Sequence, residues 1–215
     1  MIIVHLLDVV KVVVGSMPDK QFNAVNYTDP MVGRILDAGE LCIHRFGIRR
    51  TSVGEVARVG RLSRGSIYRH FKDKVALVDG IFMRRQDSFL NRTEATLEQQ
   101  ATLVDKVTES VLAGRKDMRE GIFAALAEIE PETVAMMFLD PRFYRRSVSF
   151  WPPHVRLAQA AGEISKAVDV AFATDLILRL AVSLVMFPRM GTELKTRRAL
   201  RAYLQRVLDG ALGVS

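Results

Sequence analysis

One short stretch of the chain concentrates side chains that can bind a polyanion. Residues 60–74 read GRLSRGSIYRHFKDK and contain five lysines and arginines, one histidine and one tyrosine. Serine occurs before this run and within it. Where a serine begins a helix, the first backbone N–H groups of that helix face outward. These groups and the helix dipole attract phosphate. The expected chemistry is therefore binding to phosphates and, through arginine, to the edges of bases.

Side chains in the first turn of the expected third helix could read sequence, because Arg64 can bond a guanine edge twice and Ser66 can bond several bases. Gly65 has no side chain and would let this helix approach the groove of a duplex closely. The other residues expected at this interface, as phosphate contacts, helix caps or flanking groups, are Thr51, Ser52, Arg61, Ser63, Tyr68, Arg69, His70 and Lys74.

Four helices are expected to position these residues, and each begins at a residue typical of a helix N-cap. The four expected helix starts are Asp29 with Pro30, the box SVGE at 52–55, Ser63 and Asp73. Gly47 is expected to end the first helix. Two short helices joined by a tight turn form a helix-turn-helix, whose second helix enters the major groove. The expected helices run over residues 30–46, 53–59, 64–71 and 74–90 or beyond.

The remainder of the chain is also expected to be helical, because no alternating strand pattern interrupts it. Asp175 and Arg179 lie one turn apart in a long apolar helix and are expected to pair. The fold class is thus all-α, with an N-terminal three-helix helix-turn-helix DNA-binding domain and a C-terminal helical domain. The further helices are expected over residues 102–114, 117–130, 132–139, 154–162, 168–187 and 193–212.

The net charge of +7 is uneven, since residues 29–74 hold ten basic and five acidic side chains. A basic balance suits nucleic acid or an anionic membrane. The apolar run at 1–14 lacks a basic start and contains Asp8 and Lys11, so we expect neither a signal sequence nor a membrane span. Cys42 is the only cysteine, which fits a reducing cytoplasm.

A resemblance to a known family follows from these residues. Residues 34–82 resemble the DNA-binding domain of the tetracycline-repressor-like (TetR) family of bacterial transcriptional regulators. The similarity runs through TSVGEVARVGRLSRGSIYRHFKDK, residues 51–74. It implies a homodimer, a palindromic DNA operator and a C-terminal domain that binds a small-molecule effector. The implied domains are an N-terminal extension at 1–28 that could be disordered, the DNA-binding domain at 29–75, and an effector-binding and dimerisation domain at 76–215.

The chain departs from the family pattern at Arg61, where the family usually has glycine. Either Arg61 adopts a left-handed conformation, which costs about 1 kcal/mol for a residue other than glycine, or the turn is reshaped around Gly60.

The C-terminal residues predict two surfaces. Bulky apolar side chains and two polar anchors form the candidate ligand site: Phe123, Met137, Tyr144, Phe150, Trp151 and Arg179. A helical stripe near the C-terminus is the candidate dimer interface: Leu200, Tyr203, Leu204, Val207 and Leu208.

Two functions stay open at this point. One is a ligand-responsive regulator, expected to be a repressor, and the other is a DNA-binding dimer that responds to a protein partner. The histidines lack the spacing of metal ligands and no nucleophile motif occurs, so neither an enzyme, a metal site nor a cofactor is expected.

Overall fold

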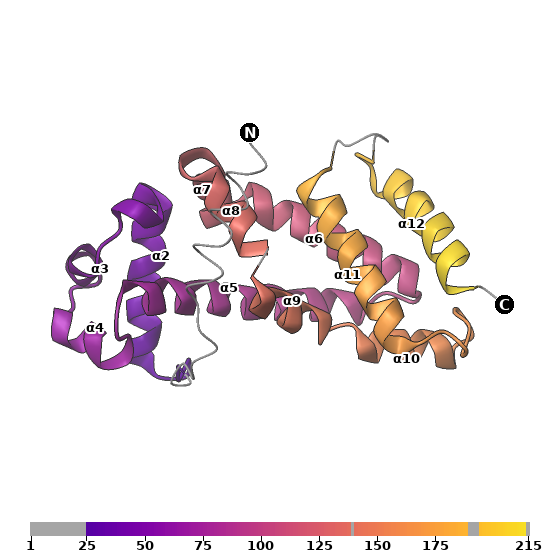
Figure 1. Ribbon diagram of the computed structural model, residues 1–215, viewed down its shortest axis with the longest axis horizontal. Coiled ribbons are helices and arrows are strands. Elements are labelled where there is room, and N and C mark those ends of the chain that lie inside the picture. Colours follow the sequence, from indigo (N-terminus) through magenta and orange to yellow (C-terminus); the bar gives the residue numbers. More distant parts are fainter. Residues whose placement is uncertain (1–24, 139, 189–193, 214–215) are drawn as a thin grey trace. The chain divides into compact units, whose positions relative to one another are not determined.

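The computed structural model describes residues 25–138, 140–188 and 194–213. Every regular element in these ranges is a helix, which confirms the all-α prediction (Figure 1). The predictions for residues 1–14 and for most of the 1–28 extension lie outside the described residues. No described helix is both long and apolar enough to cross a bilayer.

The chain divides into two compact units. The first contains described residues up to Gln86 together with Ile122–Pro141, and the second contains Asp87–Gly121 and the residues from Arg142 onward. The domain limits at 29–75 and 76–215, which the family resemblance implies, stay a prediction.

The first unit holds α2 (Pro30–Arg50), α3 (Val53–Gly60), α4 (Arg64–His70) and the start of α5 (Lys74–Leu97). It also contains α7 (Gly121–Ile129) from Ile122 onward and α8 (Pro131–Phe138). Helix α3 packs on α2 and α4 packs on α3. The side chains of this core are fully or almost fully buried, and they include Ile35, Leu36, Val56, Ile67, Phe71, Leu77 and Ile81.

The predicted helix starts are confirmed in the first unit. Asp29 accepts a hydrogen bond from the Met31 N–H (2.7 Å), and the Asp73 carboxylate accepts one from the Ala76 N–H (2.8 Å). The regular helix is interrupted at Gly47 as predicted, with φ 75° and ψ 174°, and a further short helical turn continues α2 to Arg50.

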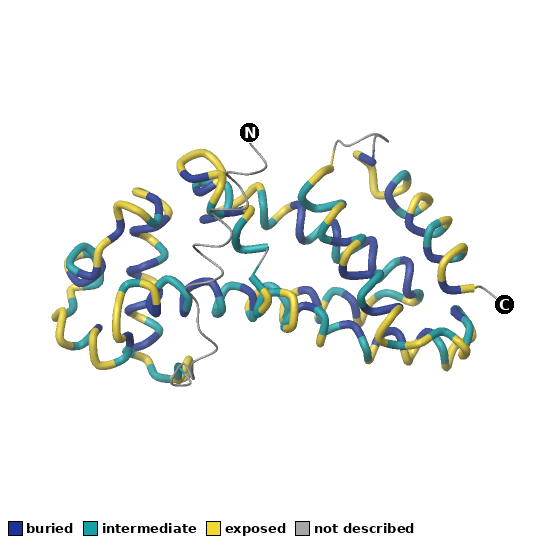
Figure 2. The backbone as a smooth tube through the Cα atoms, in the orientation of Figure 1, coloured by how far each residue is buried: buried dark blue, intermediate teal, exposed yellow. Residues whose placement is uncertain are grey.

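The second unit holds the rest of α5, α6 (Leu103–Arg119), nearly all of α9 (Pro141–Val148), α10 (Pro152–Ala160), α11 (Val170–Met186) and α12 (Arg197–Leu212). Helix α6 packs against α11 and α12, and α10 packs against α11. The buried positions of α12 recur every four residues, so one stripe of this helix faces the core (Figure 2).

Several predicted boundaries in the second half of the chain were wrong. The helix expected to end at residue 114 continues to Arg119, and its backbone leaves the helical conformation at Glu120, with φ -125° and ψ 153°. No helix was expected between residues 139 and 154, but Pro141 begins α9 there, since proline suits the first position of a helix. Thr196 caps α12, which begins four residues later than expected.

Candidate nucleic-acid interface

Helix α4 begins with a small network of hydroxyl groups. Ser63 Oγ accepts from the Ser66 N–H (3.0 Å) and lies 2.9 Å from Ser66 Oγ. Arg69 Nη2 donates to the same Ser66 Oγ (3.2 Å). The three residues follow one another at intervals of three along the helix, so they share one face. This network confirms Ser63 as the helix cap, and it holds two hydroxyls and a guanidinium together at the start of the predicted recognition helix.

Helix α3 begins at Ser52, whose Oγ accepts from the Glu55 N–H at 3.1 Å. The second half of the predicted capping box differs, since the Glu55 carboxylate instead accepts two hydrogen bonds from Arg58. That hydrogen bond with Arg58 is also the main reason why the pKa of Glu55 is lowered.

Thr51 does not have the role predicted for it. Its side chain is 2% exposed, and its hydroxyl donates to the Gly47 carbonyl at 2.7 Å. The hydroxyl therefore stabilises the turn between α2 and α3, and it is not presented to a ligand outside the protein.

The turn between α3 and α4 decides between the two alternatives for Arg61. Arg61 has φ 51° and ψ 49°, the left-handed conformation, whereas Gly60 stays within α3. The Arg61 N–H returns to the Arg58 carbonyl at 3.3 Å, and the Leu62 N–H bonds the Ala57 carbonyl at 2.8 Å. These bonds close the end of α3 as a glycine would. The turn therefore keeps its usual path and Arg61 adopts the strained conformation.

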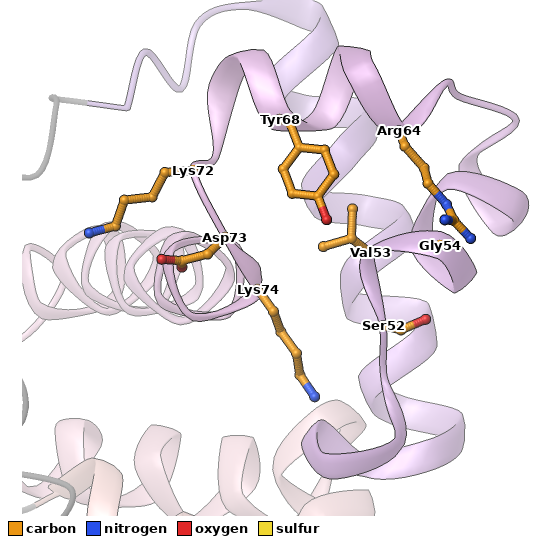
Figure 3. Close-up of a pocket in the computed structure, with 8 residues that line it drawn as sticks. All are labelled: Ser52, Val53, Gly54, Arg64, Tyr68, Lys72, Asp73 and Lys74. Atoms are coloured by element: carbon orange, nitrogen blue, oxygen red, sulfur yellow. The ribbon is translucent and has the colours of Figure 1, made fainter.

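A surface groove of about 540 Å³ opens beside these helices (Figure 3). In Figure 3, Tyr68 lies near Val53, and Arg64 lies beside Gly54. A β-carbon added at Gly54 would approach Arg64 Nη2 to 2.6 Å, so the missing side chain gives the guanidinium its place. The residues that line the groove come from α3, α4, the start of α5 and the links before them: Ser52, Val53, Gly54, Arg64, Tyr68, Lys72, Asp73 and Lys74.

Three cations and one carboxylate line this groove, and the carboxylate, Asp73, already caps α5. Lys74 Nζ donates to the Arg49 carbonyl (3.0 Å), which leaves further N–H donors of its ammonium for a ligand. A positive groove at a helix N-terminus suits a phosphate group. Four predicted interface residues, Ser52, Arg64, Tyr68 and Lys74, meet here.

His70 is turned toward another part of the unit. Its Nδ1 lies 3.9 Å from the Asp29 carboxylate at the start of α2. Its predicted phosphate contact stays a prediction, but the structure does not bring it into the groove. Gly65 is exposed, as the close approach of α4 to a ligand requires.

The six predicted ligand-site residues are divided between the two units. Phe123 and Met137 belong to the first unit, where Phe123 stacks at 6.2 Å from Phe82. In the second unit Trp151 is 2% exposed and meets Phe150 edge to face at 5.5 Å. Trp151 is therefore a core residue.

Tyr144 and Arg179 meet at Asp175. The Tyr144 hydroxyl donates to the Asp175 carboxylate, and Arg179 Nε donates to it at 2.6 Å, which confirms the predicted pair on α11. Arg179, followed by Tyr144, lowers the pKa of Asp175, and the hydrogen bond to Asp175 raises the pKa of Tyr144. Arg179 is largely exposed and Tyr144 is 37% exposed, so both predicted anchors are bound to Asp175 at the surface of the unit.

Sequence reasoning missed two buried polar groups of the second unit. His154 is 4% exposed; its Nε2 lies 3.0 Å from Glu94, and its Nδ1 has no hydrogen-bond partner among the described residues. Arg115 bonds the carbonyls of Leu184 and Leu194, and burial, followed by Arg119, lowers its pKa. The only sign of these two groups in the sequence was a single polar residue within an apolar pattern.

The leucines assigned to a dimer interface lie inside one chain. Leu200, Leu204 and Leu208 are 0–2% exposed and belong to the core of the second unit. The prediction was wrong about their partners, because the stripe on α12 packs against α6 of its own chain. Tyr203 is 37% exposed, and Val207 is half-buried.

Comparisons with known proteins agree with this geometry. Residues 35–81 match the profile described as "Bacterial regulatory proteins, tetR family". The chain is similar to the HTH-type transcriptional regulator UidR of Escherichia coli K12, with 26% identity over 163 residues, 74% of this chain and 81% of UidR. Salmonella enterica GusR is similar in structure, with 25% identity, a TM-score of 0.60, and 88% of this chain and 99% of GusR covered.

A third likeness concerns the fold alone. The regulator FadR of Bacillus subtilis in complex with stearoyl-CoA aligns with 18% identity and a TM-score of 0.53, covering 85% of this chain and 98% of FadR. The match of sequence runs through the whole helix-turn-helix, and the likeness of structure continues through both units. Residues 35–81 therefore form a helix-turn-helix domain of the TetR type, and over most of its length the chain is similar to transcriptional regulators that carry this domain.

Proposed function

We propose that this protein binds a palindromic operator as a homodimer and represses transcription until a small apolar or amphipathic effector releases it. The observation that supports DNA reading most directly is the start of α4, where Ser63, Ser66 and Arg69 form one polar face. Arg64 and the serines would contact base edges, while Ser52, Tyr68 and Lys74 would bind phosphates from the groove. Such a regulator acts where the DNA is, in the cytoplasm.

Dimerisation is proposed through the faces of α11 and α12 that do not pack on α6. Phe172 is 54% exposed on α11, and Tyr203 is exposed on α12, so each helix still carries an aromatic side chain at its surface. Two copies related by a twofold axis would place their α4 helices about 34–36 Å apart, the spacing of successive major grooves.

The effector is proposed to bind in the second unit, near the group formed by Phe150, Trp151 and His154. Apolar side chains beside one polar anchor suit an amphipathic molecule, and His154 Nδ1 is such an anchor. The FadR relative, whose solved complex holds stearoyl-CoA, supports an effector with an apolar chain.

Selection of duplexes from a random pool, followed by competition with effector candidates, tests this proposal. The selected duplexes should be palindromes and should carry two protein chains in sedimentation. Acyl thioesters, steroids, aromatic acids and cationic drugs form the effector panel. Release by one class, at an affinity reduced some 5–150-fold, is expected. If no class releases the protein, regulation through a protein partner becomes the better explanation.

A further inference from the structure

The turn that leads into the helix-turn-helix is held by side chains from distant parts of the chain. This turn covers residues 47–51, between the kink of α2 and the cap of α3. The Arg49 carbonyl accepts from Lys74 Nζ at 3.0 Å. The Arg49 N–H donates to Glu130 Oε1 at 2.8 Å. Both backbone polar groups of Arg49 are therefore bound by charged side chains.

Glu130 lies at the junction of α7 and α8 and is 3% exposed. A buried carboxylate is costly unless its oxygens are bonded. Here one oxygen accepts from Arg49 N–H, and the other accepts from Thr133 Oγ1 at 3.3 Å. A hydrogen bond to a charged acceptor is roughly twice as strong as a neutral one, and this is the buried contact that the backbone of the turn receives from the junction of α7 and α8.

The close approach of Glu130 explains why a glycine stands at the kink. A β-carbon at Gly47 would lie 2.5 Å from Glu130 Oε1 and 3.0 Å from Ile129. Gly47 also has φ 75°, which favours glycine. The glycine at the kink of α2 therefore leaves the space that the Glu130 carboxylate occupies.

We propose that Glu130 is a positioning residue for DNA binding. By holding the Arg49 N–H it fixes the turn from which α3 and its cap Ser52 begin, and it makes α7 and α8 part of the DNA-binding unit. These helices enter and leave the second unit by chain continuity at residues 121–122 and 141–142. A displacement that starts in α6 or α9 thus has a covalent route to Glu130. The inference requires DNA binding, but it does not depend on any effector.

Three variants of the full chain separate positioning from simple packing. Glu130→Ala removes the acceptor and should weaken binding to a duplex selected by the unaltered protein about tenfold, through a smaller population of the competent turn. Glu130→Gln keeps an acceptor oxygen and should retain affinity within about threefold. The matched control is Glu132→Ala, which removes only the exposed ion pair with the Arg49 side chain and should have little effect.

Hydrogen exchange at the Arg49 amide provides the second measurement. This amide should exchange about 100-fold more slowly than in an unstructured peptide, and Glu130→Ala should abolish that protection while circular dichroism stays unchanged. If Glu130→Ala does not fold, Thr133→Ala replaces it, because it loosens the same carboxylate and should cost about threefold in affinity. An unprotected Arg49 amide in the unaltered protein, or folded Glu130 and Thr133 variants that bind at full affinity, would overturn the proposal.

Discussion

Three polar side chains of the first unit begin helices at a groove, whereas two polar side chains of the second unit lie inside its core. Ser52, Ser63 and Asp73 each cap a helix, and each belongs to the positive surface or stands beside it. His154 and Arg115 are instead buried among apolar residues. Polar side chains thus cap helices beside the groove in the first unit, and in the second unit they lie within a core. Changes in the first unit should therefore alter DNA binding, whereas changes in the core of the second unit should lower the free energy of unfolding.

The largest expected effect concerns the core of the second unit. Trp151→Ala should lower the free energy of unfolding by about 3–5 kcal/mol, because the indole is buried and no neighbouring side chain fills the space. Urea denaturation followed by circular dichroism measures this loss. Leu157→Ala, which removes an exposed side chain from α10 of the same unit, is the control and should change stability by less than about 0.5 kcal/mol. Equal losses for the two variants would mean that burial within one chain does not distinguish these residues.

The next effect belongs to DNA recognition. Arg64→Ala should cost about 1–3 kcal/mol at one base pair of the operator and relax the preference there, if the guanidinium leaves Gly54 to bond a guanine edge. Lys74→Ala should weaken binding to all duplexes alike and reduce the salt slope by about 0.9. Fluorescence anisotropy with selected and randomised duplexes, at several salt concentrations, separates the two. A uniform loss for Arg64→Ala would instead assign this arginine to the phosphates.

Arg61→Gly should affect stability and binding in opposite directions. Glycine adopts the left-handed conformation without strain, so the variant should be more stable by about 1 kcal/mol. It also removes a positive charge from the surface that faces DNA, so affinity at low salt should fall. Thermal unfolding and anisotropy on the same preparation test both signs. A gain of stability together with unchanged affinity would show that Arg61 is not near a phosphate.

Some features of this structure could be predicted from the sequence and others could not. The caps at Asp29, Ser52, Ser63 and Asp73 were predictable because each hydrogen bond joins residues two or three positions apart. Periodicity also identified the apolar stripe of α12. It could not identify the stripe's partner, because the same leucines could pack on their own chain or on a second copy.

Contacts over long separations were beyond sequence reasoning altogether. Nothing in the sequence near Glu130 shows that its carboxylate accepts a hydrogen bond from Arg49, 81 residues earlier. His154 and Glu94, 60 residues apart, were missed for the same reason. Thr51 was assigned to DNA because of its place in a motif, although its hydroxyl serves the Gly47 carbonyl.

The smallest expected effect depends on pH and again contrasts a partly buried group with an exposed one. Asp105 on α6 accepts hydrogen bonds from Arg201 (2.8 Å) and from Thr102 (2.6 Å). The hydrogen bond from Arg201 is the main reason why the pKa of Asp105 is lowered, and burial opposes it. A carboxyl whose pKa is lower in the folded state stabilises the fold above its unfolded pKa of about 3.9. That contribution is lost as pH falls through the folded-state pKa.

Asp105→Asn should therefore lower the free energy of unfolding by about 1 kcal/mol at neutral pH, because α6 loses its charged contact with α12. The difference from the unaltered protein should shrink as the pH approaches 3. Urea denaturation at a series of pH values measures it. Asp175→Asn is the comparison, since Arg179 also lowers the pKa of Asp175 but is largely exposed. Its smaller effect should disappear in about 0.5 M salt, where exposed charges are screened. A gap for Asp105→Asn that stays constant with pH would mean that its charge does not stabilise the fold.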